Sequence, residues 1–204
     1  QTFDDRLLGL LGRRHSAQGA LDAYRMAQDA GFDNISIDLM YGLPEQTLEG
    51  WESTLEKMLE LHPTHISMYC LTLEEGTPFE AWVRLGKMSD PDPDLAADMY
   101  EMAQDAMRNA GYRHYEISNW ARDGLESRHN LTYWRTEPYI GVGPGAHSYL
   151  GDIRFANLNQ PREYISRLTN VEGGKPSRDD IDSGDLKKTI DMVPSVDTIE
   201  HIDR

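Results

Sequence analysis

Three stretches of the chain space their apolar residues as an amphipathic helix does. In residues 16–30 these positions fall on one face, and Ser16 and Gly31 are suited to begin and end the helix. A capping threonine opens a second helix over residues 47–61. A third helix is expected over residues 93–110, where methionines supply the apolar stripe, and we interpret that stripe as core packing.

Apolar runs typical of strands alternate with these helices. They are NISIDLMY at 34–41, HISMYCLTL at 65–73 and YRHYEIS at 112–118. This alternation predicts crossovers in a parallel sheet, either a TIM-type barrel or an open doubly wound sheet. No G-x-G-x-x-G follows the first strand, so the usual sign of a dinucleotide-binding sheet is missing.

The last part of the chain has a different composition. From about Glu172 it becomes charged and loses apolar periodicity, and residues 173–180 have the composition of a linker. We therefore expect a loosely attached or partly disordered tail over residues 172–204.

The net charge of −15 narrows the range of partners. A chain this acidic is repelled by phosphate backbones, so nucleic acid and anionic membrane surfaces are set aside as partners. No apolar run approaches the ~20 residues that span a bilayer, and no signal peptide is recognisable, so we expect a cytoplasmic location. The single cysteine, Cys70, excludes a disulfide within the chain and a metal site built from cysteines; we expect it to be a small buried strand residue.

Charged residues in two segments are candidates for ligand binding. Arg13 and Arg14 precede the first predicted helix, where arginines can hold a carboxylate or phosphate, or can simply form a solvated basic cluster. Asp38 interrupts an apolar strand, which is costly unless the carboxylate is paired. From the pattern alone, Asp38 either reaches ligand hydroxyls or an amine, or is satisfied by a neighbouring arginine.

Two later segments combine residues with distinctive chemistry. The segment HNLTYW at 129–134 contains a candidate iron ligand, His129, and two aromatic side chains. From the pattern alone, a loop anchored by aromatics is the favoured interpretation. The segment GVGPGAHS at 141–148 predicts tightly turned backbone that can approach a ligand closely. It lacks the lysine of a nucleotide-binding P-loop.

Taken together, six segments in register resemble one known family. They are QTFDDRLLGLLGRRH, NISIDLMYGLPEQT, HISMYCLTLEEGTPF, GYRHYEISNWARDG, RHNLTYW and GVGPGAHSYLGD. Over about residues 1–170 the chain resembles the HemW heme chaperones, relatives of the oxygen-independent coproporphyrinogen III oxidases (HemN). The resemblance implies an α/β fold, namely the C-terminal half of a partial (β/α)6 TIM-type barrel that binds S-adenosylmethionine (SAM), followed by a small α+β region.

The resemblance also implies cofactor sites. Five residues are assigned to the SAM pocket, namely Gln1, Arg13, Asp38, Thr72 and His147. The backbone around Ala146 and His147 is also expected near this pocket. Three residues are assigned to heme: His129, Tyr133 and Trp134. The family often has a cysteine two residues before that histidine, where this chain has Ser127.

The family's [4Fe–4S] cluster is held by a C-x3-C-x2-C loop that this chain lacks. We therefore expect a truncated product that begins at the end of the fourth barrel strand. On this reading residues 1–90 complete the barrel, residues 91–171 form the family-specific region, and residues 172–204 are a linker and a divergent tail.

The expected function follows from the same resemblance. It is a chaperone that binds heme and delivers it to a respiratory apoprotein; a membrane-protein client is one candidate, although the chain itself has no membrane segment. The alternative is an oxidoreductase that decarboxylates coproporphyrinogen III. A third hypothesis is that the isolated 204 residues are an inactive fragment.

Overall fold

The computed structural model describes residues 1–151, 153–169 and 196–201 of the chain. The chain divides into two compact units, residues 1–127 and residues 128–204. The linker expected at residues 173–180 lies outside the described residues. None of the described helices is long and apolar enough to cross a bilayer.

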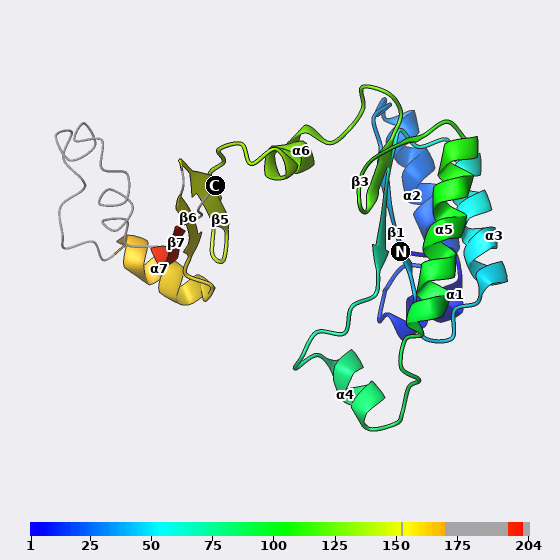
Figure 1. Cartoon of the computed structure of the whole chain (residues 1–204), viewed down its shortest axis with the longest axis horizontal. Helices are drawn as coiled ribbons and strands as arrows, with labels where there is room; N and C mark the ends of the chain where they lie inside the picture. The colour runs from blue at the N-terminus through cyan, green and yellow to red at the C-terminus, as the bar shows by residue number, and fades with distance from the viewer. Residues whose placement is uncertain (152, 170–195, 202–204) are drawn as a thin grey trace. The chain divides into compact units, whose positions relative to one another are not determined.

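The first unit is a four-stranded sheet with helices along one face. Its elements are α1 (Asp5–Leu10), α2 (Ala17–Asp29), β1 (Ser36–Tyr41), α3 (Leu48–Glu60), β2 (His65–Cys70), α4 (Pro78–Arg84), α5 (Pro93–Asn109), β3 (Arg113–Glu116) and β4 (Asn119–Ala121). The strand order is β1-β2-β4-β3, and Figure 1 shows α2, α3 and α5 on one side of the sheet. The expected boundary near residue 90 falls inside this unit, because α5 contacts both α3 and β1.

The helices predicted over residues 16–30, 47–61 and 93–110 are confirmed, and local chemistry sets their ends. The hydroxyls of Ser16 and Thr47 each accept a hydrogen bond from a backbone N–H three residues later, at 3.1 Å. Helix α2 ends in a Schellman motif, because Gly31 has a φ of 91° that L side chains rarely adopt. The short helices α1 and α4 were not predicted.

The first two predicted strands form the expected parallel pair, with Ser36 opposite His65 and Tyr41 opposite Cys70. The third strand departs from the parallel pattern. Only two residues, Ile117 and Ser118, separate β3 from β4, and a connection that short can join only antiparallel strands. Strand β4 then pairs antiparallel with β2, so the β3–β4 hairpin forms this side of the sheet.

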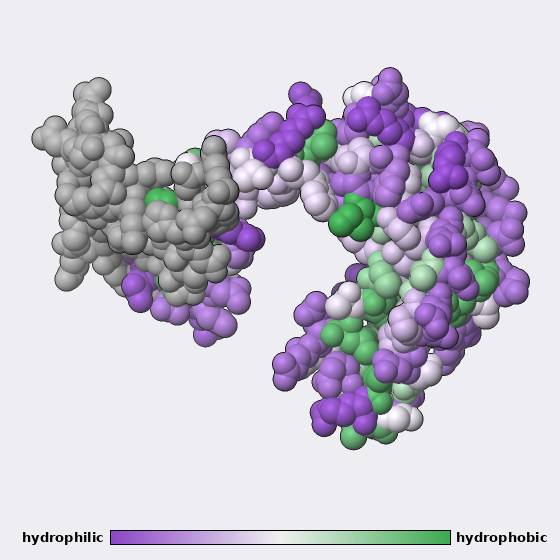
Figure 2. Space-filling view, viewed as in Figure 1, coloured by the Kyte–Doolittle hydropathy of each residue, from purple (hydrophilic) through white to green (hydrophobic). Residues whose placement is uncertain are grey.

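The core of the first unit lies between the helices and the sheet. Trp51 is fully buried, and its indole N–H donates to the backbone oxygen of Met99 at 2.8 Å. Met99 and Met107 are also fully buried, which confirms the interpretation of the methionine stripe as core. The expectation of a buried Cys70 is wrong, because Cys70 is exposed at the end of β2. On the visible face of this unit hydrophilic residues predominate, and hydrophobic ones show around α4 (Figure 2).

The second unit contains a small antiparallel sheet and two described helices. Its described elements are α6 (Arg128–Trp134), β5 (His147–Leu150), β6 (Ile153–Asn157), α7 (Pro161–Thr169) and β7 (Val196–His201), with strand order β5-β6-β7. The segment HNLTYW therefore lies in a helix, and its interpretation as a loop is wrong. This small α+β unit agrees with the fold expected after the barrel portion.

Candidate functional site

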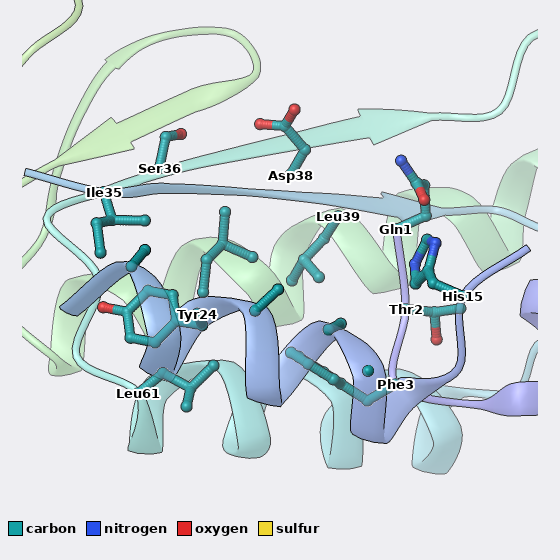
Figure 3. Close-up of a pocket in the computed structure, with 15 residues that line it drawn as sticks. Gln1, Thr2, Phe3, His15, Tyr24, Ile35, Ser36, Asp38, Leu39 and Leu61 are labelled. Atoms are coloured by element: carbon teal, nitrogen blue, oxygen red, sulfur yellow. The ribbon is translucent and has the colours of Figure 1, made fainter. Parts of the chain in front are cut away.

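The side chains of β1 alternate between two faces, and Asp38 lies on the open one. Leu39 is 1% exposed on the helix side, whereas Ser36 and Asp38 are exposed. Figure 3 shows Ser36 and Asp38 pointing away from α2 while Leu39 points towards it. An exposed carboxylate keeps its hydration, so Asp38 needs no arginine partner and is available to a ligand.

Gln1 lies beside the carboxyl end of β1, because its backbone oxygen accepts a hydrogen bond from Met40 N at 2.8 Å. The side-chain oxygen of Gln1 is buried and has no hydrogen-bond partner among the described residues. Leaving a buried carbonyl oxygen unpaired costs roughly 1–3 kcal/mol. A ligand amine, amide or hydroxyl that donates to this oxygen would remove that cost.

Arg13 is held in place by the end of α1. Gly12 adopts a φ of 66°, and Arg13 N donates to Leu8 O at 2.9 Å in a Schellman motif. Burial lowers the pKa of the Gln1 α-amino group; the charge of Arg13 lowers this pKa further, and the charge of Asp38 raises it. Three of the predicted SAM-binding residues therefore share one electrostatic environment.

A cavity of about 440 Å³ lies between α2 and β1. Gln1 and His15 line its polar part, and apolar side chains of α2 and β1 line most of the remainder. Asp38 is also a lining residue, but its carboxylate points away from α2, towards the open face of the sheet (Figure 3). Thr72 does not line this cavity; it is exposed and lies two residues beyond the end of β2. The structure thus brings Gln1 and Asp38 together, with Arg13 nearby, but leaves Thr72 outside the cavity.

The chemistry of these groups fits part of a SAM molecule. A guanidinium suits the carboxylate of its methionine moiety, and carboxylate and amide oxygens suit its amine and ribose hydroxyls. The chain does not fit a [4Fe–4S] cluster, which takes several cysteine thiolates, because it has one cysteine. Within the described residues, no group of three or more His, Cys, Asp or Glu side chains could hold a metal ion.

A hydrogen-bond chain that the sequence did not reveal crosses the open face of the sheet. Ser36 Oγ lies 2.7 Å from His65 Nδ1, and His65 Nε2 lies 2.7 Å from the hydroxyl of Tyr115. Burial lowers the pKa of His65, and the negative charges of Asp38 and Glu116 oppose that shift. These hydrogen bonds can be predicted only when the register between β1 and β2 and the position of the β3–β4 hairpin are known.

A second cavity, of about 650 Å³, lies within the second unit. It is lined by His129, Tyr133, Tyr139, Ile140, Gly141, Val142, Ala146, His147 and Arg154. Helix α6 places His129 and Tyr133 on one side, four residues apart, with 2.9 Å between His129 Nε2 and the Tyr133 hydroxyl. Trp134 is 52% exposed and is not among the residues that line this cavity.

The GVGPGAHS segment forms one wall of this cavity. A side chain at Gly141 would collide with the backbone of His147 and lie 2.9 Å from Ala146 Cβ, so only glycine fits there. The side-chain amide of Asn157 donates to the oxygens of Gly141 at 3.3 Å and Gly143 at 3.0 Å, which fixes the loop. His147, expected near the SAM pocket, therefore shares a cavity with His129.

Comparisons with known proteins place this geometry in a family. No protein-family model matches the chain. A heme chaperone HemW from Lactococcus lactis subsp. lactis is 45% identical over 165 residues, which is 81% of this chain and 44% of the relative. HemW from Bacillus subtilis is 42% identical over 179 residues, 88% of this chain and 47% of the relative. The mouse radical S-adenosyl methionine domain-containing protein 1, mitochondrial, is 49% identical over 147 residues, 72% of this chain and 33% of the relative.

Among solved structures, the coproporphyrinogen III oxidase HemN from Escherichia coli, a radical SAM enzyme, matches with a TM-score of 0.66. The match covers 93% of this chain and 48% of HemN at 22% identity, so it shows the shared fold alone. The chain spans about half the length of the curated HemW relatives it matches. Over that span, the chain belongs to the HemW-like radical SAM family.

Proposed function

We propose that the protein containing this chain is a heme chaperone, which binds heme in the cavity beside α6 and delivers it to a respiratory apoprotein. The observation that carries the proposal is the position of His129, exposed on α6 and lining a cavity with Tyr133, Tyr139 and His147. The proposal is also supported by the similarity to proteins named heme chaperone HemW.

The chemistry of the cavity suits a metalloporphyrin. An imidazole nitrogen is a common axial ligand of heme iron, and flat aromatic side chains pack against a macrocycle. The cavity volume of about 650 Å³ lies within the range of small-molecule sites. Ile140 and Val142 line it while 69% and 87% exposed, and exposed apolar side chains of this kind are typical of a surface that a ligand covers.

The first unit would bind SAM as a second ligand. In this proposal Arg13 holds the SAM carboxylate, and Gln1 and Asp38 accept hydrogen bonds from its amine and hydroxyls; the buried, unpaired oxygen of Gln1 supports that arrangement. A cluster bound elsewhere in the protein would supply the redox chemistry that the family name implies. We assign no catalytic residue within this chain.

The alternative function is oxidation of coproporphyrinogen III, the activity named for HemN. The shared fold supports it, but the sequence identity to HemN is 22%, against 42–45% for the bacterial HemW relatives above. The position of His129 in a lined cavity favours the chaperone.

The test is a titration of the purified chain with hemin, followed by the Soret band. We expect the wild type to shift the band, and His129→Ala to weaken binding about tenfold or more through loss of an iron ligand. His62→Asn is the matched control, because His62 is exposed in the first unit and asparagine tolerates its φ of 52°. Equal binding curves for wild type and His129→Ala would refute the assignment of His129.

A further inference from the structure

The cavity beside α6 contains one permanent charge. Of its nine lining residues, Arg154 alone stays cationic across the physiological pH range; the others are two histidines, two tyrosines and small or apolar residues.

Arg154 lies at the far end of a row that begins at His129. The ring centroids of His129 and Tyr133 are 4.9 Å apart, and those of Tyr133 and Tyr139 are 4.6 Å apart. Tyr139 and Tyr149 exchange two backbone hydrogen bonds of 2.8 and 2.9 Å. Tyr149 is in turn directly opposite Arg154 in the β5–β6 register, so Tyr149 and Arg154 share a face of the sheet.

This face also carries His147. Side chains two residues apart on a strand lie on one face, so His147 and Tyr149 share theirs, and the register extends that face to Arg154. The cavity therefore has the His129 imidazole on α6, tyrosine rings beside it, and the His147 imidazole and the Arg154 guanidinium on one face of the β5–β6 sheet.

Heme presents a matching distribution of groups. Its iron lies at the centre of a flat apolar ring, and its two propionate carboxylates lie together on one edge. A guanidinium offers two parallel N–H donors to a carboxylate, whereas aromatic rings suit the macrocycle face. The guanidinium of Arg154 would also offset part of the negative charge of the two propionates.

We infer that Arg154 recognises a propionate carboxylate of the heme bound beside His129, and that it thereby selects porphyrins with free carboxylates. The inference rests on the proposed heme-binding function and adds the residue that determines specificity. Strand β7 also pairs with β6 beside Arg154, so a purely structural role for Arg154 within the sheet is the competing explanation.

The experiment compares hemin with hemin dimethyl ester, which keeps the iron and the macrocycle but has no free carboxylate. Both are titrated into the purified full chain as wild type, Arg154→Met, Arg154→Lys and Arg162→Met. Arg162→Met is the matched control, since Arg162 is exposed on α7 and does not line the cavity. We expect Arg154→Met to weaken hemin binding about tenfold and to leave ester binding unchanged.

The remaining variants sharpen the result. Arg154→Lys should recover part of the hemin affinity, because a lysine keeps the charge but loses the two-pronged geometry. Arg162→Met should change neither ligand. If Arg154→Met loses equal affinity for hemin and for the ester, Arg154 has a structural role and the inference is overturned. If Arg154→Met loses no affinity for hemin, the inference is also overturned.

Failure of this inference is distinguishable from failure of the proposed function. If hemin binding requires His129 but ignores Arg154, only the role of Arg154 is overturned. If the wild type binds no hemin, or binds it regardless of His129, the heme cavity itself is refuted and the inference falls with it.

Discussion

His65 joins three strands of the first unit through its two ring nitrogens. Ser36 on β1 and Tyr115 on β3 lie on either side of it, each at 2.7 Å, and the residue is 7% exposed. A histidine that is buried and hydrogen-bonded on both nitrogens holds its partners in fixed positions. The hydrogen bonds among Ser36, His65 and Tyr115 therefore fix the open face of the sheet, on which Asp38 lies.

Burial of His65 makes the stability of the first unit depend on pH. In the folded protein, burial lowers the pKa of His65, and the negative charges of Asp38 and Glu116 oppose that shift. A histidine in an unfolded chain has a pKa of ~6.5. Below that pH the unfolded chain binds more protons, so the free energy of unfolding falls as pH decreases through the folded pKa. We expect urea unfolding to show this loss, and His65→Gln to flatten it while His62→Asn does not. The same pH slope in all three proteins would contradict it.

Single residues with unusual chemistry could be recognised in the sequence, but the residues that lie beside them in the fold could not. Asp38 was recognisable because a charge inside an apolar strand is unusual. Arg154 and Tyr115 were not, because an arginine or tyrosine in a short strand carries no signal until the register is known. His147 was recognised in the sequence, but only the folded loop after Gly141 shows that it shares a cavity with His129.

Among the elements, α6 carries the proposed heme ligand His129 and has an unfavourable end. It ends in a Schellman motif, in which Glu137 N donates to Thr132 O at 2.9 Å and Thr136 N donates to Tyr133 O at 3.0 Å. The motif requires a positive φ at Thr136, which has a φ of 53°. A β-branched side chain is strongly disfavoured there, because its Cβ crowds the backbone.

Thr136→Gly should therefore stabilise the second unit by about 1 kcal/mol, since glycine adopts positive φ without this cost. Thr132→Gly is the matched control. The same substitution inside α6 should lower stability by roughly 0.5 kcal/mol, because glycine is a poor helix former. Thermal melts of both variants would measure the difference. A lower melting temperature for Thr136→Gly would show that the hydroxyl or methyl of Thr136 makes a compensating contact.

Elements were predictable where the signal is local. Residues 16–30 and 47–61 carry both periodicity and caps, and they are helices as expected. The β3–β4 hairpin was missed because its two turn residues, Ile117 and Ser118, include none of the glycine, asparagine or aspartate residues that mark a two-residue hairpin. The segment HNLTYW lies in α6, a helix of seven residues that is too short for periodicity to separate it from a loop.

At the scale of the whole molecule, charge divides unevenly between the units. Residues 1–127 contain 23 acidic and 10 basic residues, whereas residues 128–204 contain 12 acidic and 10 basic ones. The net charges are therefore −13 and −2, and the second unit is almost neutral. An anionic porphyrin meets little repulsion from the unit that contains its proposed cavity, whereas the acidic first unit suits a cationic ligand such as SAM.

This distribution predicts how salt affects heme binding. The net repulsion from the first unit acts over long distances and is screened at ~0.15 M ionic strength, where the Debye length is about 8 Å. A contact between Arg154 and a propionate is short and is screened only at higher salt. We therefore expect the affinity for hemin to fall when the salt concentration rises from ~0.15 to ~1 M, and the affinity for the dimethyl ester to stay nearly constant. Arg154→Met should remove the salt dependence for hemin. An affinity that instead rises with salt would show that repulsion by the whole acidic chain outweighs the attraction of this one guanidinium.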